Sequence, residues 1–146
     1  MITADDVAAY ILRRCGEMTA TKLEKLVYYC QTWSLVWDEE PLFLEEIEAG
    51  ATGPVVVSLY NKHRGMFSVS EWPDGNPDRL SPTQRETVDA VLDYYGGKSP
   101  QWLSDLAQME APWKHARRAL ADAQGGWQEI THAAMAEYYG SLPDEG

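Results

Sequence analysis

A regular pattern of apolar residues runs from about Thr21 to Trp37. The apolar positions recur at steps of three and four, on one face of a helix, and the polar ones fall elsewhere around it: Leu23, Leu26, Val27, Cys30, Trp33 and Trp37, against Lys22, Glu24, Lys25 and Gln31. Thr19 or Thr21 can cap this helix, and Thr21 would form a capping box with Glu24. If the helix lay alone, its tryptophans and aliphatic side chains would be exposed to water. We therefore expect the central helix of a packed domain, a binding face, or both.

Further helix starts recur along the chain, each with a capping Thr or Ser, or with a proline in the first turn. They occur at Thr3, Gly53-Pro54, Ser81-Pro82, Ser99-Pro100, Pro112 and Thr131. The helix after Gly53-Pro54 is expected to be short. The helix that starts at Pro112 is expected to end at Gly125-Gly126, because glycine commonly follows the last helical residue.

The pattern changes between Pro41 and Gly53, where single apolar residues alternate with glutamates. Phe43 or Leu44, together with Ile47, are expected to turn inward from short strands or extended turns. Residues 67–70 alternate as a short strand does. The sequence therefore predicts a mainly α fold. We expect one compact domain over residues 1–146, with about six or seven helices and a small β element between the second and third helices.

The net charge of −11 disfavours nucleic-acid binding, because an acidic surface repels phosphates. It favours a basic partner, although many proteins are acidic for solubility alone. Six carboxylates fall close together with no intervening base: Asp38, Glu39, Glu40, Glu45, Glu46 and Glu48. This acidic segment is either a solvated loop or part of a contact surface.

No signal peptide or membrane span is recognisable. The first residues lack a basic start followed by an apolar run, and no stretch approaches the roughly 20 apolar residues that a bilayer requires. We expect a soluble, cytoplasmic protein. Cys15 and Cys30 lie on the apolar sides of predicted helices, as reduced core cysteines do.

The chain carries no motif for a nucleophile, a phosphate loop or a metal site. Its histidines have no ligand partner three or four residues away, and we expect them at the surface: His63, His115 and His132. The sequence therefore favours a protein without enzymatic activity, cofactor or metal ion.

Aromatic residues offer a candidate contact surface. Tyr28 and Tyr29 are about 100° apart on a helix, so at least one should reach the edge of the apolar face. Lys25 and Trp33 each stand four residues from Tyr29, which suggests a mixed aromatic and charged ridge beside the core. Core packing is the alternative role for these side chains. The candidate partner-binding residues are this ridge and the nearby glutamates: Lys25, Tyr28, Tyr29, Trp33, Glu45, Glu46 and Glu48.

Several motifs in fixed order resemble one known family. They are Met18-Thr19, Lys22-Leu23, Lys25-Leu26, Tyr28-Tyr29-Cys30-Gln31, Trp33, Pro41-Leu42-Phe43, Glu46-Ile47-Glu48-Ala49, Gly53-Pro54-Val55-Val56, Leu103-Ser104-Asp105-Leu106, Glu110-Ala111-Pro112-Trp113-Lys114 and Ala116-Arg117. The chain thereby resembles the Panacea domain, a SocA-like, phage-associated family best known as the antitoxin half of toxin–antitoxin pairs. The resemblance implies an antitoxin that binds a co-encoded toxin directly, and the charge favours a basic one. The alternatives are a proteolytic adaptor and a phage protein that modulates a host enzyme.

The chain departs from the family pattern at two places. Ala107-Gln108 stand where the family commonly has Thr-His, and Thr52 stands where it favours an aromatic residue before Gly-Pro. Gln108 can donate and accept hydrogen bonds, but it cannot titrate near neutral pH as histidine does.

Overall fold

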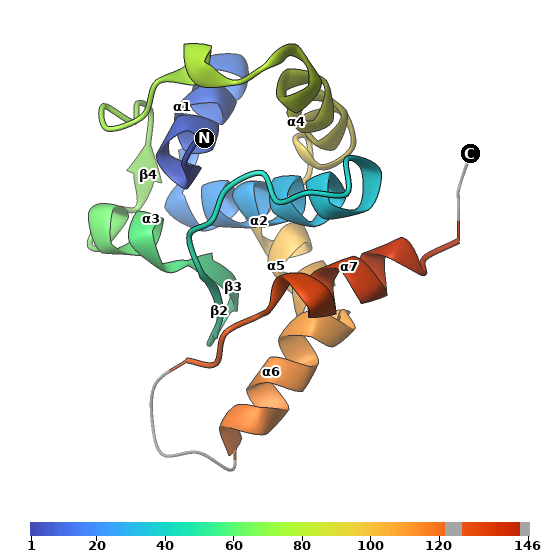
Figure 1. Cartoon of the computed structure of the whole chain (residues 1–146). Coiled ribbons are helices and arrows are strands. Elements are labelled where there is room, and N and C mark those ends of the chain that lie inside the picture. Colours follow the sequence, from blue (N-terminus) through green and yellow to red (C-terminus); the bar gives the residue numbers. More distant parts are fainter. Residues whose placement is uncertain (122–126, 144–146) are drawn as a thin grey trace.

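Helix α2 (Ala20–Trp37) crosses the middle of the molecule (Figure 1). The structure, a computed structural model, describes residues 1–121 and 127–143. In Figure 1, helices α1 and α4 lie above α2, helix α3 lies to its left, and a β-hairpin and helices α5, α6 and α7 lie below it. Contacts join α2 to α1, α3, α4, α5 and α7 and to strand β3 (Gly53–Val56). The prediction of a central helix is confirmed.

The described residues form seven α-helices and two small two-stranded sheets, so the predicted mainly α fold is confirmed. The remaining helices are α1 (Ala4–Cys15), α3 (Val57–His63), α4 (Pro82–Tyr95), α5 (Pro100–Met109), α6 (Ala111–Ala121) and α7 (His132–Gly140), and a short 3₁₀ helix, η1, spans Pro77–Arg79. Capping residues occupy the predicted starts at Thr3, Ser81, Ser99 and Thr131. Helix α6 begins just before Pro112, and its predicted end at Gly125-Gly126 lies outside the described residues.

Helix α2 is buried on every side rather than on one face. All side chains from Leu23 to Thr32 are buried, including those of Glu24, Lys25 and Gln31. The apolar periodicity alone predicts a polar face for this helix, and the structure has none over this stretch. Other elements surround the helix, so each buried polar group must find a partner within the protein.

Thr19, and not Thr21, caps α2. The Thr19 hydroxyl oxygen accepts a hydrogen bond from the amide of Lys22 at 3.1 Å, and Thr21 is exposed. Strand β1 (Met18–Thr19) pairs with β4 (Ser68–Val69), and this pairing holds Thr19 in the extended conformation that a capping residue needs. The predicted strand near Val69 is thereby confirmed.

The small β element between the second and third helices is also confirmed. Strands β2 (Ile47–Gly50) and β3 (Gly53–Val56) pair antiparallel and form a hairpin. The prediction of a helix start at Gly53-Pro54 is wrong, because these residues belong to β3 and α3 begins at Val57. All four residues of β3 are buried, and its pairing with β2 takes precedence over the local signal of the proline.

Gln31 fixes the chain that follows α2. Its side-chain oxygen accepts hydrogen bonds from the amides of Leu42 and Phe43 at 2.7 and 3.3 Å. Its side-chain nitrogen donates to the Phe43 carbonyl at 2.8 Å. The loop therefore makes strand-like hydrogen bonds with a helix side chain. Phe43 turns inward and Leu44 remains exposed, which decides between the two predicted core residues.

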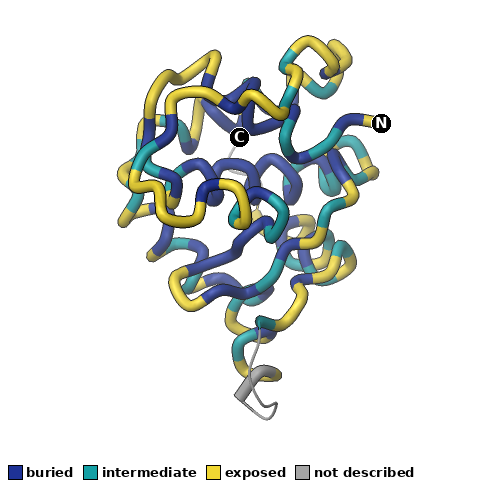
Figure 2. Tube along the Cα trace, turned by 90° about the vertical axis from the view of Figure 1, so that its left-hand side faces the viewer, coloured by how far each residue is buried: buried dark blue, intermediate teal, exposed yellow. Residues whose placement is uncertain are grey.

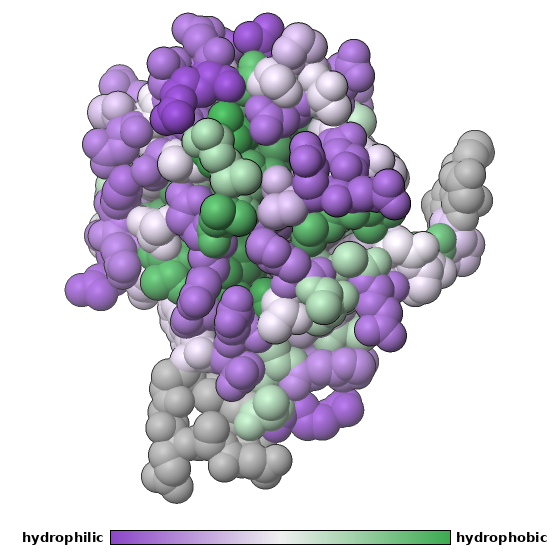
Figure 3. All heavy atoms as spheres, in the orientation of Figure 1, coloured by the Kyte–Doolittle hydropathy of each residue, from purple (hydrophilic) through white to green (hydrophobic). Residues whose placement is uncertain are grey.

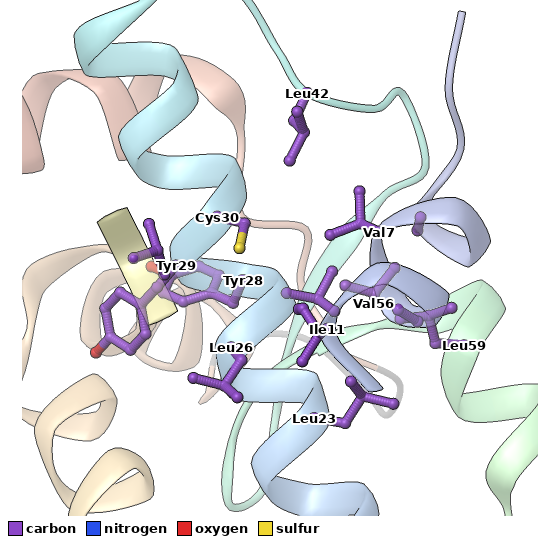
Figure 4. Packing of buried hydrophobic residues seen from close by; sticks show 14 of the residues in the cluster. Val7, Ile11, Leu23, Leu26, Tyr28, Tyr29, Cys30, Leu42, Val56 and Leu59 are labelled. Atoms are coloured by element: carbon purple, nitrogen blue, oxygen red, sulfur yellow. The ribbon is translucent and has the colours of Figure 1, made fainter. Parts of the chain in front are cut away.

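The core lies around α2. Buried segments gather in the interior and exposed ones at the outer turns (Figure 2). Val7 and Ile11 of α1 lie beside Val56 and Leu59, on the opposite side of α2 from Tyr29 (Figure 4). Hydrophilic residues cover much of the face shown in Figure 3, and hydrophobic residues show in the hollows between them. Within the described ranges, no helix has both the length and the apolar composition to cross a membrane.

The two cysteines lie in different surroundings. Both are free thiols, and Cys30 is buried as expected. Cys15 is exposed, so its predicted place in the core is wrong. It is the last residue of α1, where Gly16, with a φ of 80°, turns the chain away.

Leu26→Asp should unfold most of the protein. Leu26 is fully buried on α2, and the substitution would bury a carboxylate without a counter-charge. We expect a loss of about 4 kcal/mol or more in the free energy of unfolding, measured by urea denaturation. Leu44→Asp, at an exposed position, is the matched control. Equal stability of the two variants would contradict the central place of α2.

Candidate functional site

The predicted ridge of Lys25, Tyr28 and Tyr29 is not at the surface. The three side chains are buried, with exposed fractions of 2%, 1% and 0%. The expectation that a tyrosine of this pair reaches an exposed edge is therefore wrong. Helices α4, α5 and α7 all pack against α2 and cover the edge that an isolated amphipathic helix would expose. Of the four predicted ridge residues, only Trp33 is partly exposed.

Glu24 and His63 form a buried pair between α2 and α3. His63 Nε2 lies 2.9 Å from Glu24 Oε2, and the other carboxylate oxygen accepts a hydrogen bond from the Val56 amide at 3.0 Å. Burial raises the pKa of Glu24, and the hydrogen bond with His63 opposes that rise. The prediction of a surface position for His63 is wrong. Its partner lies on a different helix, so the spacing in the sequence gives no sign of it.

Lys25 lies against the start of the hairpin. Burial lowers the pKa of its ammonium to about 8, and the nearby Glu24 carboxylate opposes that change. Gly53 has a φ of 139°, and a Cβ at this position would stand 2.5 Å from Lys25 Cε. Both the backbone conformation and the space beside Lys25 therefore require glycine at position 53. Lys25 and Gly53, which belong to two separate motifs, are thus in contact across the core.

Glu110 joins three elements through tyrosines. Its Oε1 accepts hydrogen bonds from the hydroxyls of Tyr29 on α2 and Tyr139 on α7, each at 2.7 Å. The hydroxyls of Tyr28 and Tyr139 are 3.0 Å apart. Glu110 lies between α5 and α6, so this tyrosine–carboxylate cluster ties that junction to α2 and α7. Burial raises the pKa of Glu110, and the hydrogen bonds from Tyr139 and Tyr29 oppose that rise.

Glu110 also lines a groove of about 580 Å³, here called the aromatic groove. Its walls come from α2, α4, α5 and α7 and from the residues after α7: Trp33, Val36, Trp37, Tyr94, Tyr95, Leu106, Tyr139, Gly140, Leu142 and Pro143. Trp33 and Trp37 stack with ring centroids 5.1 Å apart. Trp33 Nε1 donates a hydrogen bond to the Tyr95 hydroxyl at 3.1 Å. Trp37 is 50% exposed and Tyr94 is 58% exposed, so aromatic rings face solvent at this groove.

Part of the acidic segment has a structural role. A Glu45 oxygen accepts a hydrogen bond from the Ala4 amide at 2.9 Å, in the first turn of α1, where a negative charge is favourable. An Asp38 oxygen accepts a hydrogen bond from the Thr87 hydroxyl at 2.6 Å, which links the end of α2 to α4. These two carboxylates are held by the protein itself.

Glu46 and Glu48 of this segment form a charged cluster with Glu129. Ile130 donates a backbone hydrogen bond to Ile47, and Ala49 donates one to Gln128, both at 2.8 Å, so residues 128–130 lie along β2. This pairing brings Glu129 opposite Glu48. Burial raises the pKa of Glu48, and the charges of Glu46 and Glu129 raise it further.

Glu46 and Glu129 line a second groove, of about 410 Å³, with Leu44, Thr131 and His132. We call this groove, together with Glu48 beside it, the acidic groove. The sequence gives no sign of Glu129 as a member, because the pairing that brings it to β2 joins positions far apart in the chain. Glu46 of the predicted acidic segment therefore lines a groove, and Glu48 stands opposite Glu129 beside it.

The two departures from the family pattern are in contact. The Gln108 side-chain nitrogen donates a hydrogen bond to the Thr52 carbonyl at 2.8 Å. Nearby, Trp113 Nε1 donates to the Gly50 carbonyl at 2.8 Å, and Arg117 donates to the Ala49 carbonyl at 3.1 Å. Three side chains of the α5–α6 region therefore hold the tip of the hairpin through its carbonyl groups.

The described residues offer surfaces for binding. Over residues 1–121 and 127–143, no group of three or more His, Cys, Asp or Glu side chains is placed to hold a metal ion. The buried charged groups Glu24 and Lys25 are enclosed by the hairpin and α3. The aromatic and acidic grooves are two of the hollows in this surface, and each has at least one carboxylate in its lining.

A comparison with protein-family models supports the predicted resemblance. The model described as "Antitoxin SocA-like, Panacea domain" matches residues 23–114, which is more than half of the chain. The matched region includes Lys25, Tyr29, Gly53 and Glu110, whose contacts are described above. No curated protein and no solved structure matches the chain.

Gly53→Ala should destabilise the fold, because alanine is strained at a φ of 139° and its Cβ would displace Lys25. We expect a loss of about 1–3 kcal/mol from the backbone strain alone, measured by urea denaturation. Gly97→Ala is the control, since a Cβ there would meet nothing within 4 Å. If the two substitutions had equal effects, Gly53 would not be required beside Lys25.

Glu110→Gln should change how stability depends on pH. The pKa of Glu110 is raised above its ordinary value of 4.5, so the folded chain holds this proton more tightly than the unfolded chain. Stability is then lost as the pH rises through the raised pKa. Relative to Glu110→Gln, the wild type should therefore lose stability as the pH rises from about 4.5, and the difference should level off above the raised pKa.

Urea denaturation of both proteins across this pH range measures the effect, and Glu71→Gln controls for the loss of one exposed carboxylate. A stability difference that is constant or grows in favour of the wild type would show that Glu110 is not a desolvated carboxyl group.

Proposed function

Because the chain belongs to the SocA-like antitoxin family with a Panacea domain, we propose that it is an antitoxin that binds a co-encoded toxin directly and holds it inactive. The family match over residues 23–114 is the observation that carries this proposal. The matched region contains most of α2, the hairpin and the Glu110 junction, which together build the centre of the fold. The protein acts in the cytoplasm.

Neutralisation of a toxin requires binding and no chemical step. An interface of roughly 1,000 Å² or more is enough to cover a toxin's functional site or to hold the toxin in an inactive conformation. We therefore assign the protein no enzymatic activity, cofactor or metal ion, and no direct contact with nucleic acid. The partner is a protein, and the acidic groove with the net charge of −11 suits a basic one.

The acidic groove is a surface for electrostatic attraction of the toxin. Glu46, Glu48 and Glu129 lie together, and their mutual repulsion contributes to the raised pKa of Glu48. A basic surface placed against them would relieve this repulsion. Glu45 belongs to the same segment, but its hydrogen bond to Ala4 makes it a poor choice for a binding variant.

The direct test expresses the adjacent open reading frame with and without this chain. We expect growth arrest when the neighbouring gene is expressed alone, normal growth when both are expressed, and copurification of the two proteins. A neighbouring product that is harmless, or that fails to bind this chain, would refute the antitoxin function.

Neutralising the acidic groove should slow toxin association. In the triple variant Glu46→Gln, Glu48→Gln and Glu129→Gln, we expect a lower association rate with a weaker dependence on salt, because such charges act mainly on the encounter. Stopped-flow or surface-based kinetics at two salt concentrations measures both quantities.

The matched control is Glu71→Gln, Glu86→Gln and Asp93→Asn, which removes the same charge from other exposed positions. If the control slows association as much as the acidic-groove variant, only the net charge matters and the acidic groove is a solvated surface.

A further inference from the structure

We infer that the aromatic groove receives a lysine or arginine side chain of the partner protein, with Glu110 as the counter-charge. The identification of the partner rests on the proposed antitoxin function. The binding of an alkyl cation by the groove does not depend on the antitoxin function.

Glu110 is a buried charge that the fold does not need. Glu110 is 7% exposed, and its Oε1 accepts hydrogen bonds from the hydroxyls of both Tyr29 and Tyr139. A glutamine at this position would accept the same two hydrogen bonds without a charge. Burying a carboxylate is costly unless a positive group compensates it.

The protein supplies no such compensation within reach. Among the described residues, no Lys, Arg or His nitrogen lies within 4.0 Å of a Glu110 oxygen, and no hydrogen bond reaches Oε2. Glu110 also lines the aromatic groove. A cation that enters the groove can therefore approach this carboxylate.

The rings of the groove suit a cation with an apolar stem. The faces of Trp and Tyr attract ammonium and guanidinium groups, and lysine and arginine bury their methylene stems along apolar surface. The chain's own Lys98 already lies over two such rings, 5.8 Å from the centroid of Tyr94 and 4.8 Å from that of Trp102. Tyr94 belongs to the groove wall, so this region of the surface already holds a lysine ammonium.

Other ligand classes fit less well. Glu110 and the net charge of −11 repel anions. A metal ion needs several ligands, and in the described chain Glu110 belongs to no group of three or more metal-binding side chains. A volume of about 580 Å³ with aromatic walls and one carboxylate corresponds to a side-chain pocket for a basic residue.

The test titrates the full chain with n-butylguanidinium and n-butylammonium, which reproduce the two side chains, and with the neutral pentanamide. The readout is the indole N–H signals of Trp33 and Trp37 in ¹H–¹⁵N NMR spectra. We expect saturable shifts for both cations. We expect pentanamide to bind at least about tenfold more weakly than either cation.

Glu110→Gln should weaken binding of n-butylguanidinium about tenfold or more while the spectrum stays that of a folded protein. Glu46→Gln, in the acidic groove, is the matched control and should bind as the wild type does. Trp37→Ala is a second variant at a half-exposed position, and it should also weaken binding. Equal affinity of the wild type and Glu110→Gln, or of the wild type and Trp37→Ala, would overturn the inference. Equal binding of pentanamide would show that the groove selects apolar ligands and not cations.

A second measurement separates this inference from the antitoxin function. If the product of the adjacent gene binds the wild type, Glu110→Gln and Trp37→Ala should both raise its dissociation rate. Wild-type affinity in both variants would mean that the toxin does not use the aromatic groove, and the antitoxin function would stand. If that product does not bind at all, the antitoxin function fails, and the cation titration still decides whether the groove binds cations.

Discussion

The structure depends on the complete burial of α2. A helix that is covered on every side must have each polar side chain satisfied by another element, since an unpaired buried group is costly. Glu24 accepts a hydrogen bond from the Val56 amide and pairs with His63. Gln31 forms hydrogen bonds with the backbone of residues 42–43, and the Tyr29 hydroxyl donates to Glu110. These three contacts determine where the hairpin, the following loop and the α5–α6 junction lie against α2.

The same constraint explains why separate motifs occur together in this chain. Lys25 needs the space that Gly53 leaves, and the Tyr29 hydroxyl donates a hydrogen bond to a side-chain oxygen of Glu110. Trp113 follows Glu110 closely and holds the hairpin at Gly50. The residues of the motifs thus contact one another across the core. Trp33, Leu106 and Glu110 also line the aromatic groove, and of these three only Glu110 carries a carboxylate.

The sequence predicts the elements of this fold better than their contacts. Capping signals such as Ser81-Pro82 are local, and the structure follows them. At Gly53-Pro54 the local signal fails, because pairing with β2 and contact with Lys25 outweigh the preference of proline for a helix start. The apolar periodicity of α2 also cannot predict that Tyr28 and Tyr29 are buried, because helices from other parts of the chain cover them.

For the candidate site, too, the sequence shows some of the residues but not the contacts between them. The acidic segment is visible in the sequence, but Glu45 is held by α1 and Glu129 joins only through the pairing of residues 128–130 with β2. The sequence shows Glu110 in its motif and gives no sign that it is a buried carboxylate. That property requires Tyr29, Tyr139 and the groove to meet in space.

Glu110 is a desolvated carboxyl group that lines the groove for which we propose cation binding. A ¹³C NMR titration of its side-chain carboxyl carbon, with and without n-butylguanidinium, tests this most directly. We expect a pKa above the ordinary value of 4.5 in the free chain, because burial disfavours the charged form, and a lower pKa when the cation is bound. A pKa at or below 4.5 that does not change with the cation would contradict it.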